Sequence, residues 1–226
     1  MPCQAFSHMP KSVAAKHRLS EIPSGDAGTA ATIEQMRKLV REARLDKRIR
    51  KLAGSIIQSC GQKDWRCYME ALFAWVRKNI KYVYDQQGIE VLQYPWVTVE
   101  TKAGDCDDQA MLLSALAESI GLNTAFVTCR ANPKSRDYSH VYLYIWLPRQ
   151  KEPVAADTTM PYPLGWEPPK KYERRIWRIT QPEGGGMFDA LFGLGATPVV
   201  QNTGIRKSSY VALGLSALLL MWGLRR

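Results

Sequence analysis

Residues 103–121 read Ala-Gly-Asp-Cys-Asp-Asp-Gln-Ala-Met-Leu-Leu-Ser-Ala-Leu-Ala-Glu-Ser-Ile-Gly, a glycine turn that delivers a cysteine to the start of an apolar helix. The apolar residues from Ala110 to Ile120 recur at helical spacing, and Gly121 supplies a stop signal. Because Met111 and further leucines make the helix apolar around most of its circumference, we expect it to be central rather than superficial. The sequence therefore predicts that Cys106 lies in the first turn of a buried helix.

Cys106 is the predicted nucleophile. In the first helical turn its sulfur would lie among N–H groups without intrahelical partners, where the helix dipole favours a negative charge and lowers the thiol pKa. Asp105, Asp107 and Asp108 have the opposite effect, because nearby carboxylates disfavour a thiolate, so a catalytic Cys106 needs a cationic partner. The alternative is a small buried hydrophobe, the usual state of a free cysteine. Three flanking aspartates speak against it, because aspartate is rarely fully buried.

His140 and Asp157 are the predicted partners of this thiol. The base required is a histidine, and of the three histidines only His140 falls on predicted regular structure, at the start of the strong strand 139–147. Asp157 ends a short predicted strand, 154–157, which could pair with it and let the carboxylate orient the imidazole. The alternatives are a core histidine and an aspartate in a turn. Both faces of strand 139–147 are largely apolar and should be covered, the His140 face by the helix that begins at Cys106.

The rest of the chain divides by composition. Residues 1–28 are polar and punctuated by proline and glycine, which predicts a flexible arm. A catalytic domain is predicted at 29–180, a glycine-rich linker at 181–207 and an apolar C-terminal helix at 208–226. Within the domain, helices are predicted at 32–60 and 64–79, a strand or extended segment at 80–84, a strand at 124–129, and a strand or arm at 172–180.

The formal net charge is +10, concentrated at Arg37–Lys51 and Lys170–Arg178. Neither region carries a nucleic-acid-binding motif, so solvated helix faces explain the charge better than specific nucleic-acid binding. The five cysteines include no Cys-x-x-Cys and suggest neither a disulfide framework nor a zinc site. Cys60 and Cys67 could bridge two helix ends, but a reducing compartment is the default expectation. No signal peptide is apparent at the N-terminus.

Several segments resemble the transglutaminase-like superfamily of cysteine enzymes: Trp75 to Val83, Gly104-Asp105-Cys106-Asp107-Asp108, His140 to Leu143, and Asp157-Thr158. The resemblance extends from about residue 70 to residue 166. It implies a papain-like α+β core with a central cysteine-bearing helix on an antiparallel sheet, in which Cys106, His140 and Asp157 are nucleophile, base and orienting carboxylate. In similar proteins a glutamine just upstream often helps to bind the oxyanion, so Gln93 is a candidate, with an ordinary loop residue as the alternative.

The activity implied is acyl transfer by a cysteine peptidase or amidase on a peptide or protein substrate. The alternatives are a cross-linking transglutaminase and a structural or assembly protein, of a virion or a membrane, with a vestigial triad. The chemistry needs no cofactor or metal, and no calcium-loop spacing of the EF-hand type occurs.

The apolar run 209–224 is flanked by basic residues on both sides and would reach about 24 Å as a helix, against about 30 Å of hydrocarbon core. Tyr210 and Trp222 stand near its ends as interfacial anchors do. We therefore expect membrane association through this segment, a buried or partner-bound helix being the alternative. Proteins with such a domain and no signal peptide occur in bacteria and their phages, so the expected locations are a phage virion or the cytoplasmic face of a bacterial membrane.

Overall fold

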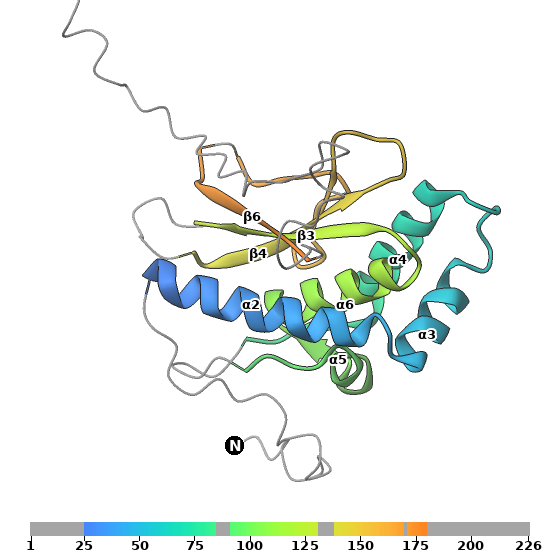
Figure 1. The fold of residues 1–226 in the computed structure, drawn as a ribbon, viewed down its shortest axis with the longest axis horizontal. Coiled ribbons are helices and arrows are strands. Elements are labelled where there is room, and N and C mark those ends of the chain that lie inside the picture. Colours follow the sequence, from blue (N-terminus) through green and yellow to red (C-terminus); the bar gives the residue numbers. More distant parts are fainter. Residues whose placement is uncertain (1–24, 85–90, 131–137, 170, 180–226) are drawn as a thin grey trace, which may run out of the picture.

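A four-stranded antiparallel sheet with helices gathered on one side forms the part of the chain that the computed structural model describes, residues 25–84, 91–130, 138–169 and 171–179 (Figure 1). The strand order is β5-β4-β3-β6. The strands are β3 (Asn123–Cys129), β4 (His140–Trp146), β5 (Val154–Ala156) and β6 (Arg174–Arg178). The predicted α+β arrangement is confirmed.

Helix α6 (Cys106–Ser119) is the centre of the domain. It contacts α2, α3, α4 and α5 on its outer sides and β3 and β4 of the sheet. Every residue from Asp108 to Ala117 is buried, which confirms the prediction of a central helix. Its apolar side chains join those of the other helices and of one sheet face in a single core. This packing fixes the position of the helix start, where Cys106 lies.

The sheet face against α6 is the aliphatic one, so the prediction that this helix covers the His140 face is wrong. Val141, Leu143 and Ile145 of β4 belong to the core that contains α6. Tyr142 and Tyr144 point to the other face, where they are buried in a second cluster with Ala125, Val127, Cys129 and Ala155. The branched aliphatic residues form the layer on which a helix packs, and strand alternation sends the aromatic rings to the opposite side. Both faces are nevertheless buried, as predicted.

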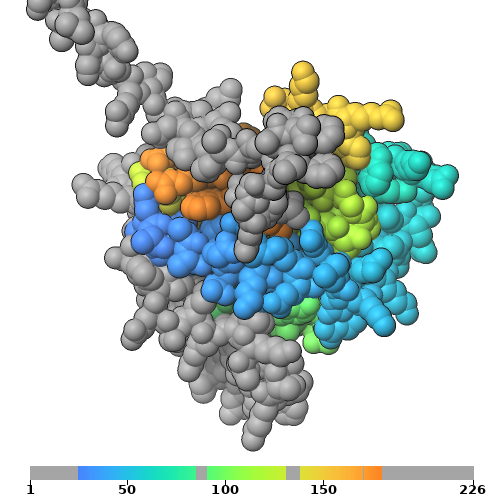
Figure 2. Space-filling model, viewed as in Figure 1, coloured from blue at the N-terminus to red at the C-terminus, as the bar shows by residue number. Residues whose placement is uncertain are grey.

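The predicted helix 32–60 is two helices, α2 (Gly25–Ala43) and α3 (Lys47–Ile57). The break follows from Asp46, whose side chain accepts a hydrogen bond from the Arg48 N–H and caps α3. Helix α2 also begins within the segment predicted to be an arm. Its first turn is held by an ion pair of 2.6 Å between Asp26 and Arg175 of β6. Figure 2 shows the surfaces of α2 and β6 in direct contact.

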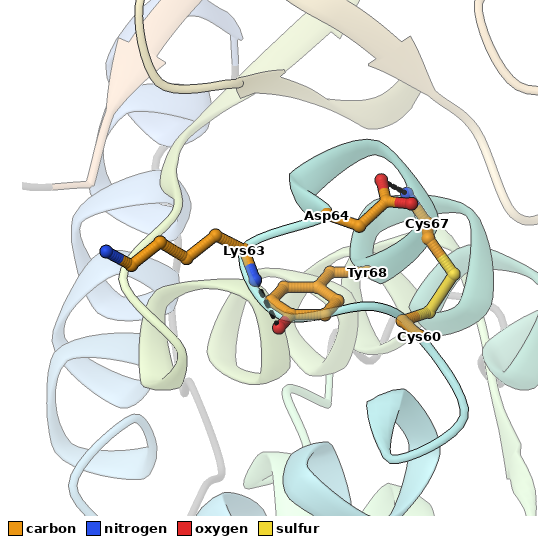
Figure 3. The surroundings of a disulfide bond; sticks show 5 residues. All are labelled: Cys60, Lys63, Asp64, Cys67 and Tyr68. Atoms are coloured by element: carbon orange, nitrogen blue, oxygen red, sulfur yellow. Dashed lines mark hydrogen bonds between the residues drawn. A yellow bond between two sulfur atoms is a disulfide. The ribbon is translucent and has the colours of Figure 1, made fainter.

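A disulfide between Cys60 and Cys67 joins the end of α3 to the start of α4 (Trp65–Asn79) (Figure 3). The same connection is held by the Cys67 N–H, donated to the Asp64 carboxylate at 3.0 Å, and by the Lys63 N–H, donated to the Tyr68 hydroxyl at 3.0 Å. The sequence analysis allowed this bridge as a possibility but did not predict it. Because it closes a short loop, we expect a modest stabilisation of about 2–3 kcal/mol.

A two-stranded parallel sheet stands beside the start of α6. Strand β1 (Lys81–Tyr82) pairs with β2 (Ala103–Gly104), with Tyr82 opposite Gly104. Between them lies α5 (Pro95–Thr101), which the sequence analysis missed although Pro95 occupies its first turn, a common helix-start signal. This small sheet brings residue 82 close to the Cys106 turn.

The predicted linker at 181–207 and the apolar segment at 208–226 lie outside the described residues, as does most of the predicted arm. In the described ranges, no helix has the length and hydropathy needed to cross a membrane. Membrane association through the C-terminal segment therefore stays a prediction.

Candidate active site

Cys106 is the first residue of α6, and Asp105 caps the helix. One oxygen of Asp105 accepts the N–H groups of Asp107 at 3.0 Å and Asp108 at 3.2 Å. As the first helical residue, Cys106 has an N–H without an intrahelical acceptor. Cys106 is intermediate in exposure as a residue, and the buried length of α6 gives it a rigid support. The placement of Cys106 in the first turn is as the sequence predicted.

The start of β4 lies against this thiol. The backbone N–H of Val141 lies near enough to the Cys106 sulfur to act on the thiol and lower its pKa. Strand β5 pairs with β4 only from Leu143 to Ile145, so it does not extend to Val141. The residue before Val141 is His140, so the predicted base follows directly in the chain from the backbone that lies near the thiol.

His140 is paired with Asp157 across the β4–β5 hairpin. The imidazole Nε2 lies 2.7 Å from one carboxylate oxygen, and the side chains of the two residues are 14% and 2% exposed. The other carboxylate oxygen accepts the Thr159 hydroxyl at 2.7 Å and its N–H at 3.1 Å. Asp157 is thus fixed at both oxygens, and the ring can rotate little. With Nε2 held by the carboxylate, Nδ1 is the nitrogen left to exchange a proton with a thiol.

Hydrogen bonding keeps Asp157 charged. Burial raises the pKa of this carboxyl, but the hydrogen bond and charge of His140, together with the Thr159 bonds, outweigh burial and hold the pKa below its ordinary value. The carboxylate consequently stays ionised to a lower pH than an ordinary aspartate and can stabilise an imidazolium whenever one forms.

Gln93, the predicted oxyanion donor, contacts a buried carboxylate in the structure, and its role toward an oxyanion stays a prediction. Its side-chain amide donates to Asp108 at 2.7 Å and to the Ala103 carbonyl at 3.4 Å, and its backbone N–H donates to the other Asp108 oxygen at 2.8 Å. Asp108 is 1% exposed. Gln93 therefore satisfies a buried carboxylate and ties the segment before α5 to α6. The Cys106 N–H, at the start of α6 and without an intrahelical acceptor, is a second candidate for an oxyanion donor.

The pKa of the Cys106 thiol is raised well above its ordinary value, contrary to the prediction from the helix dipole. Burial is the largest cause, and the charges of Asp107 and Asp105 follow. The Val141 N–H acts in the other direction but is outweighed. The Cys106 sulfur also lies 3.5 Å from an Asp107 oxygen, as a thiol donor would. At rest Cys106 is thus a neutral thiol, and it would need a base in order to act as a nucleophile.

Alkylation of Cys106 by iodoacetamide is expected to accelerate steadily with pH and to reach half its maximal rate above about pH 9, because only the thiolate reacts. The measurement is intact-mass kinetics on the native protein, with the urea-unfolded chain as reference, whose thiols titrate near about 8.5. Asp107→Asn should move the midpoint downward, since it removes a charge that opposes the thiolate. A rate plateau at neutral pH would contradict the neutral-thiol assignment.

Tyr82 is a neighbour of this site that the sequence analysis did not single out. Burial of part of the ring raises the pKa of its phenol, and the charges of Asp105 and Asp107 raise it further. Its signal in the sequence was the extended segment 80–84 upstream of the cysteine turn, which is too general to mark a site. Across the described parts of the chain, no group of three or more His, Cys, Asp or Glu side chains is placed to hold a metal ion.

Residues 50–157 match the model of the transglutaminase-like superfamily, and they include Cys106, His140 and Asp157. This segment, a little under half of the chain, is similar to that superfamily. The match supports a cysteine-dependent hydrolase or transferase activity. No curated protein matches the chain.

Solved structures also show similarity. A candidate cysteine protease from Cytophaga hutchinsonii is 19% identical over 50% of this chain and 37% of its own, with a TM-score of 0.39. A candidate protease from Parabacteroides distasonis is 7% identical over 66% of this chain and 29% of its own, with a TM-score of 0.46. LapG of Legionella pneumophila is 17% identical over 65% of this chain and 87% of its own, with a TM-score of 0.38. The chain thus spans well under half the length of the first two, and all three TM-scores lie below 0.5.

Proposed function

We propose that the protein is a cysteine peptidase or amidase that cleaves peptide or amide bonds through Cys106, His140 and Asp157. The observation that carries this proposal is the geometry around the thiol. The Val141 N–H reaches the Cys106 sulfur, and the adjacent His140 is locked by a 2.7 Å bond to a carboxylate that is itself held by Thr159. A histidine with a purely structural role would not need an ionised aspartate, hydrogen-bonded through both of its oxygens, close to a thiol at the start of a helix.

In this mechanism Cys106 attacks the amide carbonyl as a neutral thiol, and Nδ1 of His140 takes the sulfur proton as the carbon–sulfur bond forms. The proton then passes to the departing amine as the carbon–nitrogen bond breaks, which leaves a thioester on Cys106. Asp157 stabilises the imidazolium between these two transfers. Water resolves the thioester, with His140 as its base, and releases a carboxylic acid and the free thiol.

The Cys106 N–H binds the oxyanion of the tetrahedral intermediate in this scheme, where one such donor contributes about 3 kcal/mol. The positive end of α6 points to the same place and favours the developing negative charge. Helix α6 therefore has two roles in this scheme. Its first N–H stabilises the negative charge of the oxyanion, and its buried length keeps Cys106 in a fixed position.

The proposal is tested with p-nitrophenyl acetate, which needs no knowledge of the substrate. We expect one acetyl group on Cys106 by intact mass and peptide mapping at neutral pH, with release of p-nitrophenol, and no acetylation of this position in Cys106→Ser. Turnover in water alone supports a hydrolase. Turnover that requires an added primary amine would contradict this proposal and support a cross-linking transglutaminase instead. Acetylation no faster than that of the urea-unfolded chain would favour a structural protein with a vestigial triad.

A further inference from the structure

The carboxylate of Asp157 stands beyond the end of the sheet. Strand β5 pairs with β4 only as far as Ala156, which lies opposite Leu143, so Asp157 is the first residue after this ladder. Its side chain is nevertheless 2% exposed, and one of its oxygens lies 2.7 Å from Nε2 of His140. A side chain at a strand end has several staggered directions open to it. A contact other than strand pairing is therefore needed to aim this carboxylate at the imidazole.

Thr159 supplies such a contact, with two donors on one oxygen. Its hydroxyl donates to Oδ1 of Asp157 at 2.7 Å and its backbone N–H donates to the same atom at 3.1 Å, whereas Oδ2 faces His140. Any residue except proline could donate the backbone bond. The hydroxyl bond is the shorter one and requires threonine or serine. The identity of residue 159 therefore acts on Asp157 through the hydroxyl.

Burial makes this hydroxyl difficult to replace. Water has little access to a carboxylate whose side chain is 2% exposed, and hydrogen bonds to a charged group are stronger than those between neutral groups. Without the hydroxyl, Oδ1 would keep a single donor. The terminal torsion of aspartate is broad, so the carboxylate could then turn and carry Oδ2 away from Nε2. The imidazole would lose the partner that fixes its orientation.

We propose that Thr159 is a positioning residue of the reaction, whose hydroxyl aims the Asp157 carboxylate at Nε2 of His140 and so leaves Nδ1 oriented to take the thiol proton. This inference rests on the proposed function, because it assigns Thr159 a share in the base that serves Cys106. Thr159 contacts neither the substrate nor the reacting atoms in this scheme. Its effect passes through Asp157, which distinguishes it from a threonine that only stabilises the turn.

The variant Thr159→Val removes the hydroxyl but keeps the backbone N–H and most of the side-chain shape. We expect it to slow acetylation of Cys106 by p-nitrophenyl acetate about 10-fold at neutral pH, the scale of one hydrogen bond to a charged group. Thr159→Ser, which keeps a hydroxyl, should stay within about 3-fold of the wild type. The matched control is Thr158→Val, since Thr158 is also buried but it is Thr159 that bonds the carboxylate. This control should acetylate at the wild-type rate, measured by intact mass on the full chain.

A double-mutant cycle with Asp157→Ala tests whether the effect passes through the carboxylate. In that background Thr159→Val should cause no further loss of rate, because the group that the hydroxyl aims is gone. The proton NMR spectrum gives a second readout, the downfield signal of Nε2–H, identified by its loss in His140→Ala. This signal should broaden or move upfield in Thr159→Val and persist in Thr158→Val. A merely structural threonine would change the free energy of unfolding in urea and leave the signal in place.

The outcomes separate the positioning role from the proposed function. A wild-type rate in Thr159→Val, or an equal loss of rate with and without the Asp157 carboxylate, would overturn the positioning role while His140-dependent acetylation of Cys106 upheld the thiol mechanism. A rate that does not change in His140→Ala would overturn the proposed function itself.

Discussion

His140→Ala is expected to slow the acetylation of Cys106 by p-nitrophenyl acetate about 100- to 10,000-fold at neutral pH, the range that a positioned general base contributes. The reason is the state of the thiol. Burial and two carboxylates raise the pKa of Cys106, so hardly any thiolate exists at neutral pH and the attack depends on proton transfer to the imidazole. The measurement is the initial rate of adduct formation in the variant and in the wild type.

Two further variants distinguish catalysis from folding. Added imidazole should restore part of the rate in His140→Ala, because a small base can enter the space of the missing ring, and it should leave Cys106→Ser inert. The rate of His140→Ala should converge on that of the wild type as pH rises past the thiol pKa, since the thiolate then forms without help. A variant that acetylates at the wild-type rate at neutral pH would exclude His140 as the base.

Thr159, which holds the carboxylate of Asp157, could not be predicted from the sequence. It donates both its hydroxyl and its N–H to Asp157, and it follows Asp157 by two residues in a turn where threonine is common. Nothing in its sequence position distinguishes this role from an ordinary turn contact. The positions of the three predicted site residues were predictable because each stands at an end of a regular element: Cys106 starts a helix, His140 starts a strand, and Asp157 follows one.

The direction of the Cys106 pKa shift was predicted from two local effects alone, the helix start and the flanking aspartates, without the effect of burial in the folded domain. Helix start and flanking aspartates are visible in the sequence, whereas the burial that dominates the thiol pKa depends on how α6 enters the core. The contacts of Gln93 also depend on the tertiary fold. Its amide contacts Asp108, fifteen residues away, and only the folded chain shows that a buried carboxylate uses both donors of this residue.

The helical part of the fold was predictable in kind but not in its boundaries. The apolar stripe of residues 32–60 shifts near Leu45, and the structure places the break between α2 and α3 there because Asp46 can cap a new helix. The extra turns of α2 depend on the ion pair of Asp26 with Arg175, whose partner is 149 residues away. The alternation of side chains along β4 does not determine which of its two faces packs against α6. That depends on the packing of the whole sheet against the helices.

Gly104→Ala is expected to destabilise the domain by about 1–3 kcal/mol or more and to abolish acetylation of Cys106. An added Cβ would lie 2.6 Å from Cβ of Asp108, 2.9 Å from its Oδ2 and 3.2 Å from Cγ2 of Thr98. Asp108 cannot give way without cost, because its carboxylate is buried and bonded to Gln93 through both oxygens. The glycine is therefore required for the close approach of the turn to α6, which sets the position of the sulfur.

Urea unfolding measures the loss of stability, and the glycine of α3 supplies the matched control. Gly54 lies inside that helix, and an added Cβ there meets nothing within 4 Å. Gly54→Ala should accordingly leave the acetylation rate unchanged and raise the free energy of unfolding by up to about 1 kcal/mol, because alanine restricts the unfolded chain. If Gly104→Ala unfolded at the wild-type urea concentration and acetylated normally, the turn would not be held by Asp108. The rigid support assigned to Cys106 would then have to come from the capped helix alone.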